Sequence, residues 1–176
     1  MLHLLTQRNS TFKEVISYKS RPLRNNEIDW VDFHYVTPAD FEHLIQADVF
    51  LEYALIHNMY YYGTKRSDIE DALQEGKVII KEIDIQWIVK ISENHHDLYK
   101  SAFTVFLDLS DETMVHRITT RAPISAEEVE KRLLSAKTER QLAAQYCNKI
   151  VSAEWTIEEV YQSVYQAIQD FINQHK

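Results

Sequence analysis

Glycine is scarce in this 176-residue chain, which contains only Gly63 and Gly76. Glycine usually makes up about 7% of a protein. A loop that wraps its backbone around a triphosphate, of the form G-x-x-x-x-G-K-[ST], needs glycine at fixed positions. No such loop occurs in the sequence. The 176 residues of this sequence therefore do not contain the glycine-rich loop that most commonly binds the phosphates of a nucleoside triphosphate.

Cysteine and long apolar runs are also lacking. Cys147 is the only cysteine, so no internal disulfide can form, which is typical of a reducing compartment. No apolar run approaches the roughly 20 residues of a membrane span, and the apolar start is too short for a signal peptide. The sequence predicts a cytoplasmic protein that does not bind a membrane.

Basic charge is in deficit, with 19 Lys and Arg against 27 Asp and Glu and a net charge of -8. An acidic surface repels polyanions over long range, which disfavours nucleic acid and membrane surfaces as partners. A phosphorylated ligand would need a local cluster of arginines instead. Hydrophobic residues make up 45% of the chain, which favours a packed globular domain.

Strand and helix patterns alternate over most of the chain, which predicts an α/β fold with a mostly parallel sheet covered by helices. Strands are expected at residues 13–18, 78–80, 103–109 and 148–152. Helix starts are indicated by capping residues, which are Thr37 before Pro38, Ser67 with Glu70, Asp84, Ser110, Ser125 with Glu128, and Thr156 with Glu159. The irregular middle third suggests a small subdomain inserted into a single domain.

The run from Ser17 to Arg24 follows a predicted strand and carries Arg21 and Arg24. Two guanidinium groups three residues apart, preceded by hydroxyls, can grip a phosphate bidentately. A solvated basic loop would contain the same residues, so this run alone leaves both interpretations open.

A second group combines Glu52 with the run Tyr60 to Thr64. A carboxylate can accept two N–H donors from a guanine edge, and a tyrosine hydroxyl can reach a phosphate. The structural alternative is that these tyrosines pack in a core.

A third group, Arg117, Arg121 and Arg132, lies on the later predicted helices. Arginines converging on one cleft would stabilise a transferring phosphoryl group. The alternative is ordinary surface helices, with Glu128 and Arg132 forming an i,i+4 ion pair.

Two acids, Glu82 and Asp84, follow the strand predicted at residues 78–80. Acids at a strand end often meet a base or a hydrated metal, whereas Asp84 could equally be a helix N-cap.

In order and spacing these groups resemble the guanylate kinase family, whose members transfer the terminal phosphate of ATP to GMP. Residues 17–24 are similar to the family run S-x-x-[ST]-R-x-x-R, and residues 61–64 to Y-Y-G-[ST]. Residues 82–86 are similar to D-I-D-x-Q, and residues 117–132 to the arginine-rich lid. These motifs stand in family order and cover nearly the whole chain.

The resemblance implies a P-loop-kinase-like parallel sheet flanked by helices, with a mixed subdomain at about residues 20–76 for the nucleoside monophosphate and a helical lid at about 117–140. It implies a GMP site formed by Ser17, Arg21, Arg24, Glu52, Tyr62, Thr64, Glu82 and Asp84. Arg21, Arg24 and Tyr62 would hold the phosphate, while Glu52 with Thr64 and Asp84 would read the guanine. The implied catalytic residues are Arg117, Arg121 and Arg132, and the implied cofactors are ATP and Mg²⁺.

The chain departs from the family pattern at several positions. Phe33 stands where the family has a tyrosine, so one phosphate hydroxyl is missing, and Glu82 replaces an aspartate. One extra residue lies between Glu52 and Gly63. Trp87 and Ala122 replace glycines, and Ser152-Ala153 replaces an Asn-Asp pair.

The first residues, Met1 to Gln7, resemble the end of the family's first helix. The first strand and the phosphate loop, about 20 residues, would then be missing. We therefore expect unpaired strand edges and a chain that begins late, from an internal methionine or a truncated gene. Whether a homodimer supplies the strand is left open.

The expected function is that of a guanylate-kinase-like protein that keeps its GMP site but transfers phosphate poorly. The alternatives are a non-catalytic module that binds a phosphorylated ligand or protein, and a related kinase with another phosphorylated acceptor.

Overall fold

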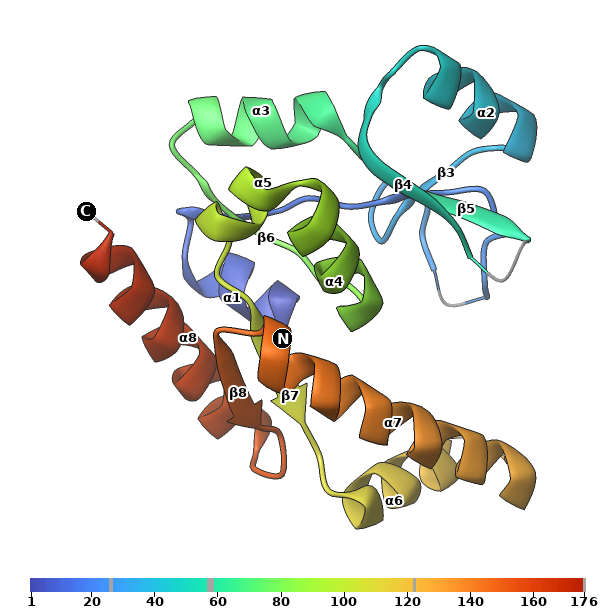
Figure 1. Ribbon diagram of the computed structural model, residues 1–176, viewed down its shortest axis with the longest axis vertical. Coiled ribbons are helices and arrows are strands. Elements are labelled where there is room, and N and C mark those ends of the chain that lie inside the picture. The colour runs from blue at the N-terminus through green and yellow to red at the C-terminus, as the bar shows by residue number, and fades with distance from the viewer. Residues whose placement is uncertain (26, 57–58, 122, 176) are drawn as a thin grey trace. The chain divides into compact units, whose positions relative to one another are not determined.

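The computed structural model describes residues 1–25, 27–56, 59–121 and 123–175 (Figure 1). Ala122, one of the departures from the family pattern, lies outside these residues, as do positions 57–58 in the region of the extra residue. The chain divides into two compact units, Leu2–Glu82 and Ile83–Lys176, with Met1 grouped with the second. Each unit has its own sheet and its own core.

The first unit contains a mixed sheet and a separate parallel strand pair. Its elements are α1 (Leu2–Arg8), β1 (Phe12–Glu14), β2 (Tyr18–Lys19), β3 (His34–Tyr35), α2 (Pro38–Gln46), β4 (Phe50–Ile56), β5 (Tyr60–Lys65), α3 (Arg66–Gln74) and β6 (Val78–Ile80). The mixed sheet has the order β3-β2-β5-β4, in which β2 is parallel to β3 and antiparallel to β5. Strands β1 and β6 form the parallel pair.

The single strand predicted at residues 13–18 is wrong, because the structure divides it into β1 and β2. The amide of Val15 donates to the carbonyl of Ile80 at 3.4 Å and ends the pairing with β6. Two residues later the carbonyl of Ser17 accepts from the amide of His34 at 2.9 Å. The backbone thus changes partners within three residues, and one continuous ladder cannot form.

One face of the mixed sheet packs against α2 and forms the core of the first unit. Tyr18, Phe41 and Phe50 are buried together, and the rings of Phe41 and Phe50 stack with centroids 4.4 Å apart. A Cβ atom on Gly63 would lie 3.0 Å from both rings. The glycine therefore lets Phe41 of α2 and Phe50 of β4 pack directly against the backbone of β5.

The ends of the helices in the first unit confirm one predicted cap and correct another. Thr37 caps α2 by accepting from the amide of Asp40 at 3.1 Å, with Pro38 at the first helical position. The capping box predicted for Ser67 is wrong: α3 begins at Arg66 and no side chain caps it. Strand β5 continues directly into α3, so Ser67 is already inside the helix. The helix ends before Gly76, as predicted, where φ is +69°.

The second unit contains a parallel strand pair covered by helices. Its elements are α4 (Ile85–Asn94), α5 (His96–Ser101), β7 (Val105–Asp108), α6 (Asp111–Arg121), α7 (Ala126–Tyr146), β8 (Lys149–Ser152) and α8 (Ile157–Gln174). Strands β7 and β8 pair in parallel from Val105 opposite Lys149 to Asp108 opposite Ser152. Helices α4 and α7 bury Ile85, Ile88 and Ala143 between them.

Capping residues start the helices of the second unit as predicted. Asp84, Ser110 and Ser125 each accept from a backbone amide in the first turn of their helix. Thr156 and Glu159 form the full capping box of α8. Glu128 does not complete a box with Ser125, because its carboxylate pairs with Arg132 instead.

The mixed α/β architecture agrees with the sequence-based expectation, but the parallel sheet differs from it. Among the described residues, parallel pairing occurs as the separate pairs β1–β6 and β7–β8 and between β2 and β3, and the largest sheet is mixed. Among those same residues no helix combines the length and apolarity needed to cross a bilayer.

Candidate functional site

Strand register brings most of the predicted phosphate-ligand and base-reading residues to one face of the mixed sheet. Lys19 of β2 lies opposite both Tyr62 and Tyr35, and Glu52 of β4 lies opposite Thr64. Directly opposed residues project to the same side, and side chains alternate along a strand. We call this side, opposite α2, the polar face; its residues are Ser17, Lys19, Arg21, Phe33, Tyr35, Glu52, Tyr62 and Thr64.

Arg21 lies at one end of the polar face and is held by Glu27. One terminal nitrogen donates to Oε2 of Glu27 at 2.7 Å, and the other donates to Oε1. The side chains are 7% and 15% exposed, so this is a largely buried ion pair. The hydrogen bonds hold the pKa of Glu27 far below its usual range and raise the pKa of Arg21. Glu27 is not among the residues predicted from the sequence, although an acid six residues after a conspicuous arginine is a readable signal.

Arg24 is placed differently from Arg21. Its backbone amide donates to Glu27 at 2.9 Å, which fixes the loop, while the residue itself is exposed. No hydrogen bond or ion pair of its guanidinium group occurs with the described residues. Arg24 is therefore available to an incoming anion.

Glu52 and Thr64 form the other end of the polar face. The hydroxyl of Thr64, a residue only 2% exposed, donates to Oε1 of Glu52. Nearby, Nζ of Lys81 donates to Oγ of Ser17 at 2.7 Å and to the carbonyl of Val15 at 3.3 Å. Burial lowers the pKa of Lys81, and the charge of Glu52 partly offsets this effect. Lys81, a lysine directly after a buried apolar strand, is a second residue that sequence reasoning missed.

Between these two ends lies Lys19, a third residue that sequence reasoning missed. It is 9% exposed, and its Nζ atom lies 2.9 Å from the ring centroid of Phe33 and 5.0 Å from that of Tyr62. Burial, followed by repulsion from Arg21, lowers its pKa to about 8. Nε of Arg21 is also buried without a hydrogen-bond partner among the described residues. Burial and an interaction with Glu27 raise the pKa of Tyr35 to about 12.

The two acids predicted near the guanine fall in different units. Glu82 is the last residue of the first unit and is exposed. Asp84 belongs to the second unit, where its carboxylate accepts from the amide of Gln86 at 2.8 Å and caps α4. The N-cap interpretation of Asp84 is thus confirmed, and a contact of either acid with guanine stays a prediction.

The three predicted catalytic arginines are all exposed on α6 and α7. Arg117 donates to the carbonyl of Ala153 at 2.9 Å. Arg132 lies 3.4 Å from Glu128, with both side chains 55% exposed, which is the i,i+4 ion pair that the sequence offers as the structural alternative. Arg121 ends α6 and forms no ion pair with a described residue. No hydrogen bond among the described residues links these three guanidinium groups to one another.

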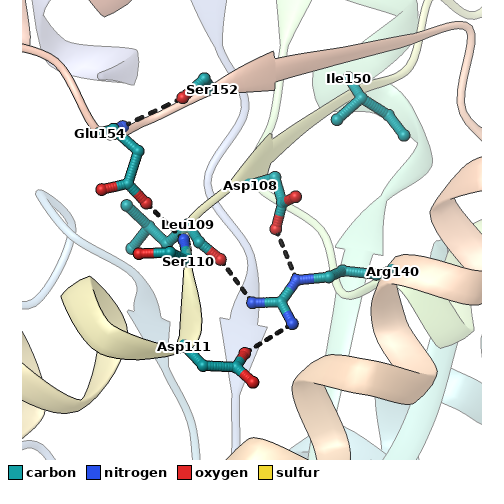
Figure 2. Close-up of a pocket in the computed structure, with 8 residues that line it drawn as sticks. All are labelled: Asp108, Leu109, Ser110, Asp111, Arg140, Ile150, Ser152 and Glu154. Atoms are coloured by element: carbon teal, nitrogen blue, oxygen red, sulfur yellow. Dashed lines mark hydrogen bonds and ion pairs between the residues drawn. The ribbon is translucent and has the colours of Figure 1, made fainter.

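An open cavity of about 720 Å³ lies in the second unit at the carboxyl ends of β7 and β8 (Figure 2). Arg140 projects into it and is fully engaged: it pairs with Asp108 at 2.8 Å and Asp111 at 2.7 Å and donates to the carbonyl of Leu109. Ser152 also lines the cavity. The one arginine that lines it is therefore already neutralised.

The described residues contain no group of three or more His, Cys, Asp or Glu side chains placed to hold a metal ion.

Comparison with known proteins gives one consistent result. The family model described as "Guanylate kinase" matches residues 1–171. Guanylate kinases from Sulfurimonas denitrificans and Helicobacter pylori are each 34% identical to the chain, over 78% and 79% of it and 65% and 66% of their own lengths. The chain thus spans about two thirds of the curated relatives that it matches.

Structural comparison agrees at the level of the fold. The crystal structure of guanylate kinase from Anaplasma phagocytophilum matches with a TM-score of 0.63 at 20% sequence identity. The match covers 92% of this chain and 76% of that structure. At this identity the likeness concerns the mixed α/β fold alone.

Proposed function

Because this chain belongs to the guanylate kinase family, we propose that it binds GMP on the polar face of the mixed sheet. The observation that supports the proposal is the strand register, which puts Lys19, Tyr62, Glu52 and Thr64 on one face. Arg21 lies next to that face, with its guanidinium carbon 5.5 Å from the ring centroid of Tyr35. Residues suited to bind a phosphate and residues suited to bind a base thereby lie on one surface. The proposed monophosphate subdomain, about residues 20–76, falls within the first unit.

The base end of the site would use Glu52 as the acceptor for the N–H edge of guanine. Thr64 donates to one carboxylate oxygen and fixes its orientation, while the remaining lone pairs can accept from the base. Lys81 supplies a nearby positive charge and holds Ser17 at the same end. Asp84 and Glu82 are assigned to this end only by the family resemblance.

The phosphate end would use Arg24, Arg21 and Tyr62. Arg24 is exposed and its guanidinium group is free to turn toward an anion, whereas Arg21 is preoriented by Glu27. Charge-assisted hydrogen bonds of this kind contribute about 1.5–3 kcal/mol each. Arg24 is therefore the residue whose removal tests the site with the least disturbance of the fold.

We further propose that this 176-residue chain does not by itself transfer phosphate at a useful rate. The sequence contains no glycine-rich loop for a triphosphate, and the arginine of the cavity at β7 and β8 is occupied by two aspartates. Backbone amides and cations that neutralise the donor phosphates account for most of catalysis in such reactions. Arg117, Arg121 and Arg132, in the lid proposed at about residues 117–140, would bridge the phosphates if a donor were bound.

A second candidate function is a non-catalytic module that binds a phosphorylated protein. It is favoured by the exposed and scattered positions of the three lid arginines, which leave the polar face as the only proposed phosphate site. Binding of a phosphoserine peptide more tightly than GMP would support this candidate.

Isothermal calorimetry with GMP, AMP and ribose 5-phosphate tests the proposal. We expect GMP to bind in the micromolar range, more tightly than the other two, and Arg24→Ala to weaken it by about tenfold or more. Lys131→Ala removes an equally exposed cation on α7 and serves as the control.

No binding of GMP at millimolar concentration would overturn the proposed site. Rapid formation of GDP from ATP and GMP by this chain would overturn the proposal that it does not transfer phosphate.

A further inference from the structure

We infer that Lys19 is a phosphate-binding residue that replaces the hydroxyl which Phe33, standing where the family has a tyrosine, does not provide. The inference rests on the proposed GMP site and extends it by Lys19, which occupies an unspecified position in the family run that residues 17–24 resemble. It follows from where the ammonium group lies, what it lacks as a partner, and which charges surround it.

The backbone places Lys19 at the centre of the proposed phosphate end. It lies on β2 opposite Tyr62 of β5 and opposite Tyr35 of β3. Its Nζ atom lies 2.9 Å from the ring centroid of Phe33, and the guanidinium carbon of Arg21 lies 6.0 Å from the same centroid. The hydroxyl of a tyrosine at position 33 and the ammonium group of Lys19 could therefore donate hydrogen bonds to the same phosphate.

Lys19 is buried without an anionic partner. It is 9% exposed, and its ammonium group forms no hydrogen bond or ion pair with the residues that the structure describes. Buried lysines are rare, and an unpaired one is costly because the ammonium loses its hydration. The cation–π contact with Phe33 offsets only part of that loss. Such a residue is expected where a ligand supplies the missing acceptor.

A neighbouring donor shares this condition. Nε of Arg21 is buried on the same face without a hydrogen-bond partner among the described residues. Beside it, burial and an interaction with Glu27 raise the pKa of the Tyr35 hydroxyl to about 12. The guanidinium carbon of Arg21 lies 5.5 Å from the centroid of the Tyr35 ring, so these groups adjoin one another. A tetrahedral anion with several acceptor oxygens can satisfy donors gathered in this way, whereas a neutral base edge cannot.

The charges around Lys19 match a phosphate monoester. Lys19, Arg21 and Arg24 are opposed by Glu27, and the influence of Glu82 on Lys19 is the weakest of these. With Glu82 counted beside Glu27, three cations face two carboxylates, and the net positive charge that remains favours a phosphate anion. Binding of that anion would also stabilise the charged form of Lys19.

A purely structural role for Lys19 makes opposite predictions. In that case the stem and ammonium would support the aromatic cluster, and replacing Lys19 would destabilise the protein. If Lys19 instead serves a ligand, removing its buried charge should raise the midpoint of unfolding at pH 7 while weakening GMP binding. Sites that bind charged ligands commonly show this opposition between stability and function.

The test compares Lys19→Met with wild type and with Lys65→Met. Methionine keeps the length of the stem, and Lys65 lies on the same sheet but projects to the opposite face by register. We expect Lys19→Met to weaken GMP binding by about 10- to 100-fold and to leave guanosine binding unchanged, and we expect the Lys65→Met control to bind GMP like wild type. Adding Phe33→Tyr to Lys19→Met should recover part of the affinity.

The pH dependence provides a second readout. Because the pKa of Lys19 is about 8 in the free protein, GMP affinity should fall as the pH rises above 8 in wild type. Arg21 and Glu27 keep their charges in this range, and burial raises the pKa of Tyr35 to about 12. A fall just above pH 8 should therefore be absent in Lys19→Met. At high pH, where Lys19 is neutral, the GMP affinity of the wild-type protein should approach that of Lys19→Met.

The outcomes separate this inference from the proposed function. GMP binding by Lys19→Met at wild-type strength would overturn the role of Lys19 and leave the GMP site standing. A shift of the Lys19 ammonium resonance with inorganic phosphate, without binding of GMP, would support Lys19 and overturn guanine recognition. Absence of binding to both phosphate and GMP would overturn both.

Discussion

Arg21 of the first unit and the three predicted lid arginines of the second unit are held in opposite ways. In the first unit, Arg21 is buried and fixed by two hydrogen bonds to Glu27. In the second, Arg117, Arg121 and Arg132 stand exposed on helices with at most one weak partner each. The first arrangement is prepared for a ligand before it arrives, whereas the second would have to be organised by the ligand.

This difference distinguishes binding of a monophosphate, which we assign to the first unit, from transfer of a phosphoryl group, which would need the lid arginines. Preorganised donors lower the cost of binding because few side chains must be ordered. Exposed arginines must lose rotamer freedom when they close on a phosphate, at about 0.5–1.5 kcal/mol for each side chain. A chain built in this way suits recognition of a monophosphate more than transfer to it.

The largest expected effect is that of Arg21→Ala, which removes the preorganised arginine. Removal of one partner from a buried ion pair leaves the other charge unpaired, so we expect a loss of about 3 kcal/mol. Amide hydrogen exchange should show the loss in β2 and β5 and leave α7 unchanged, because exchange reports each region separately.

The same pair predicts a pH dependence for the first unit. Arg21 holds the pKa of Glu27 well below its usual value, which is about 4.3 in an unfolded chain. The pair therefore stabilises the fold above that pH, and the stabilisation is lost as the pH falls below it. Arg21→Ala should abolish this dependence, and an unchanged acid profile would contradict the role assigned to the pair.

An intermediate effect is expected from Gly63→Ala. This variant tests whether packing between α2 and the mixed sheet keeps the residues of the polar face in position. The new Cβ would lie 3.0 Å from the rings of Phe41 and Phe50, and overpacking of this kind costs about 1–3 kcal/mol. Because Tyr62 and Thr64 flank the glycine, GMP binding should weaken as well. Thermal unfolding and calorimetry measure the two effects.

Gly76→Ala is the matched control for that prediction. Gly76 has a positive φ of +69° but open space around its Cα, so alanine there should cost about 1 kcal/mol through the backbone alone. Its effect on GMP binding should be absent. Equal weakening of GMP binding by both variants would mean that reduced stability, rather than the position of β5, explains the result.

The smallest effect is expected from Arg132→Ala in the second unit. Arg132 and Glu128 are both 55% exposed, and exposed i,i+4 pairs contribute about 0.3–0.5 kcal/mol. The change in unfolding free energy should therefore stay below about 0.5 kcal/mol. A loss comparable to that of Arg21→Ala would remove the contrast between the two units.

Local signals in the sequence predicted much of this architecture. The caps at Thr37, Asp84 and Thr156 and the helix end at Gly76 are confirmed, because capping depends on residues within one turn. The motif residues Glu52, Tyr62 and Thr64 share a face by strand register. Their assignment to GMP stays a prediction.

What the sequence concealed depends on contacts between distant segments. The break between β1 and β2 arises because they pair with different strands, and a run of six residues carries no sign of that. Lys81 and Lys19 read as ordinary polar residues until strand pairing buries them beside Ser17 and Phe33. The failed cap at Ser67 had the same cause, since β5 leads into α3 without a turn.

The alternation of Tyr18 and Lys19 along β2 has an evolutionary consequence. Tyr18 belongs to the core with Phe41, and Lys19 faces the opposite side with Arg21. A point substitution can thus change one side without touching the other. Insertion or deletion of one residue in β2 would instead exchange the two sides at once. Single replacements on the polar face can therefore alter the proposed GMP site and leave the core intact, whereas a change in the length of β2 would disturb both.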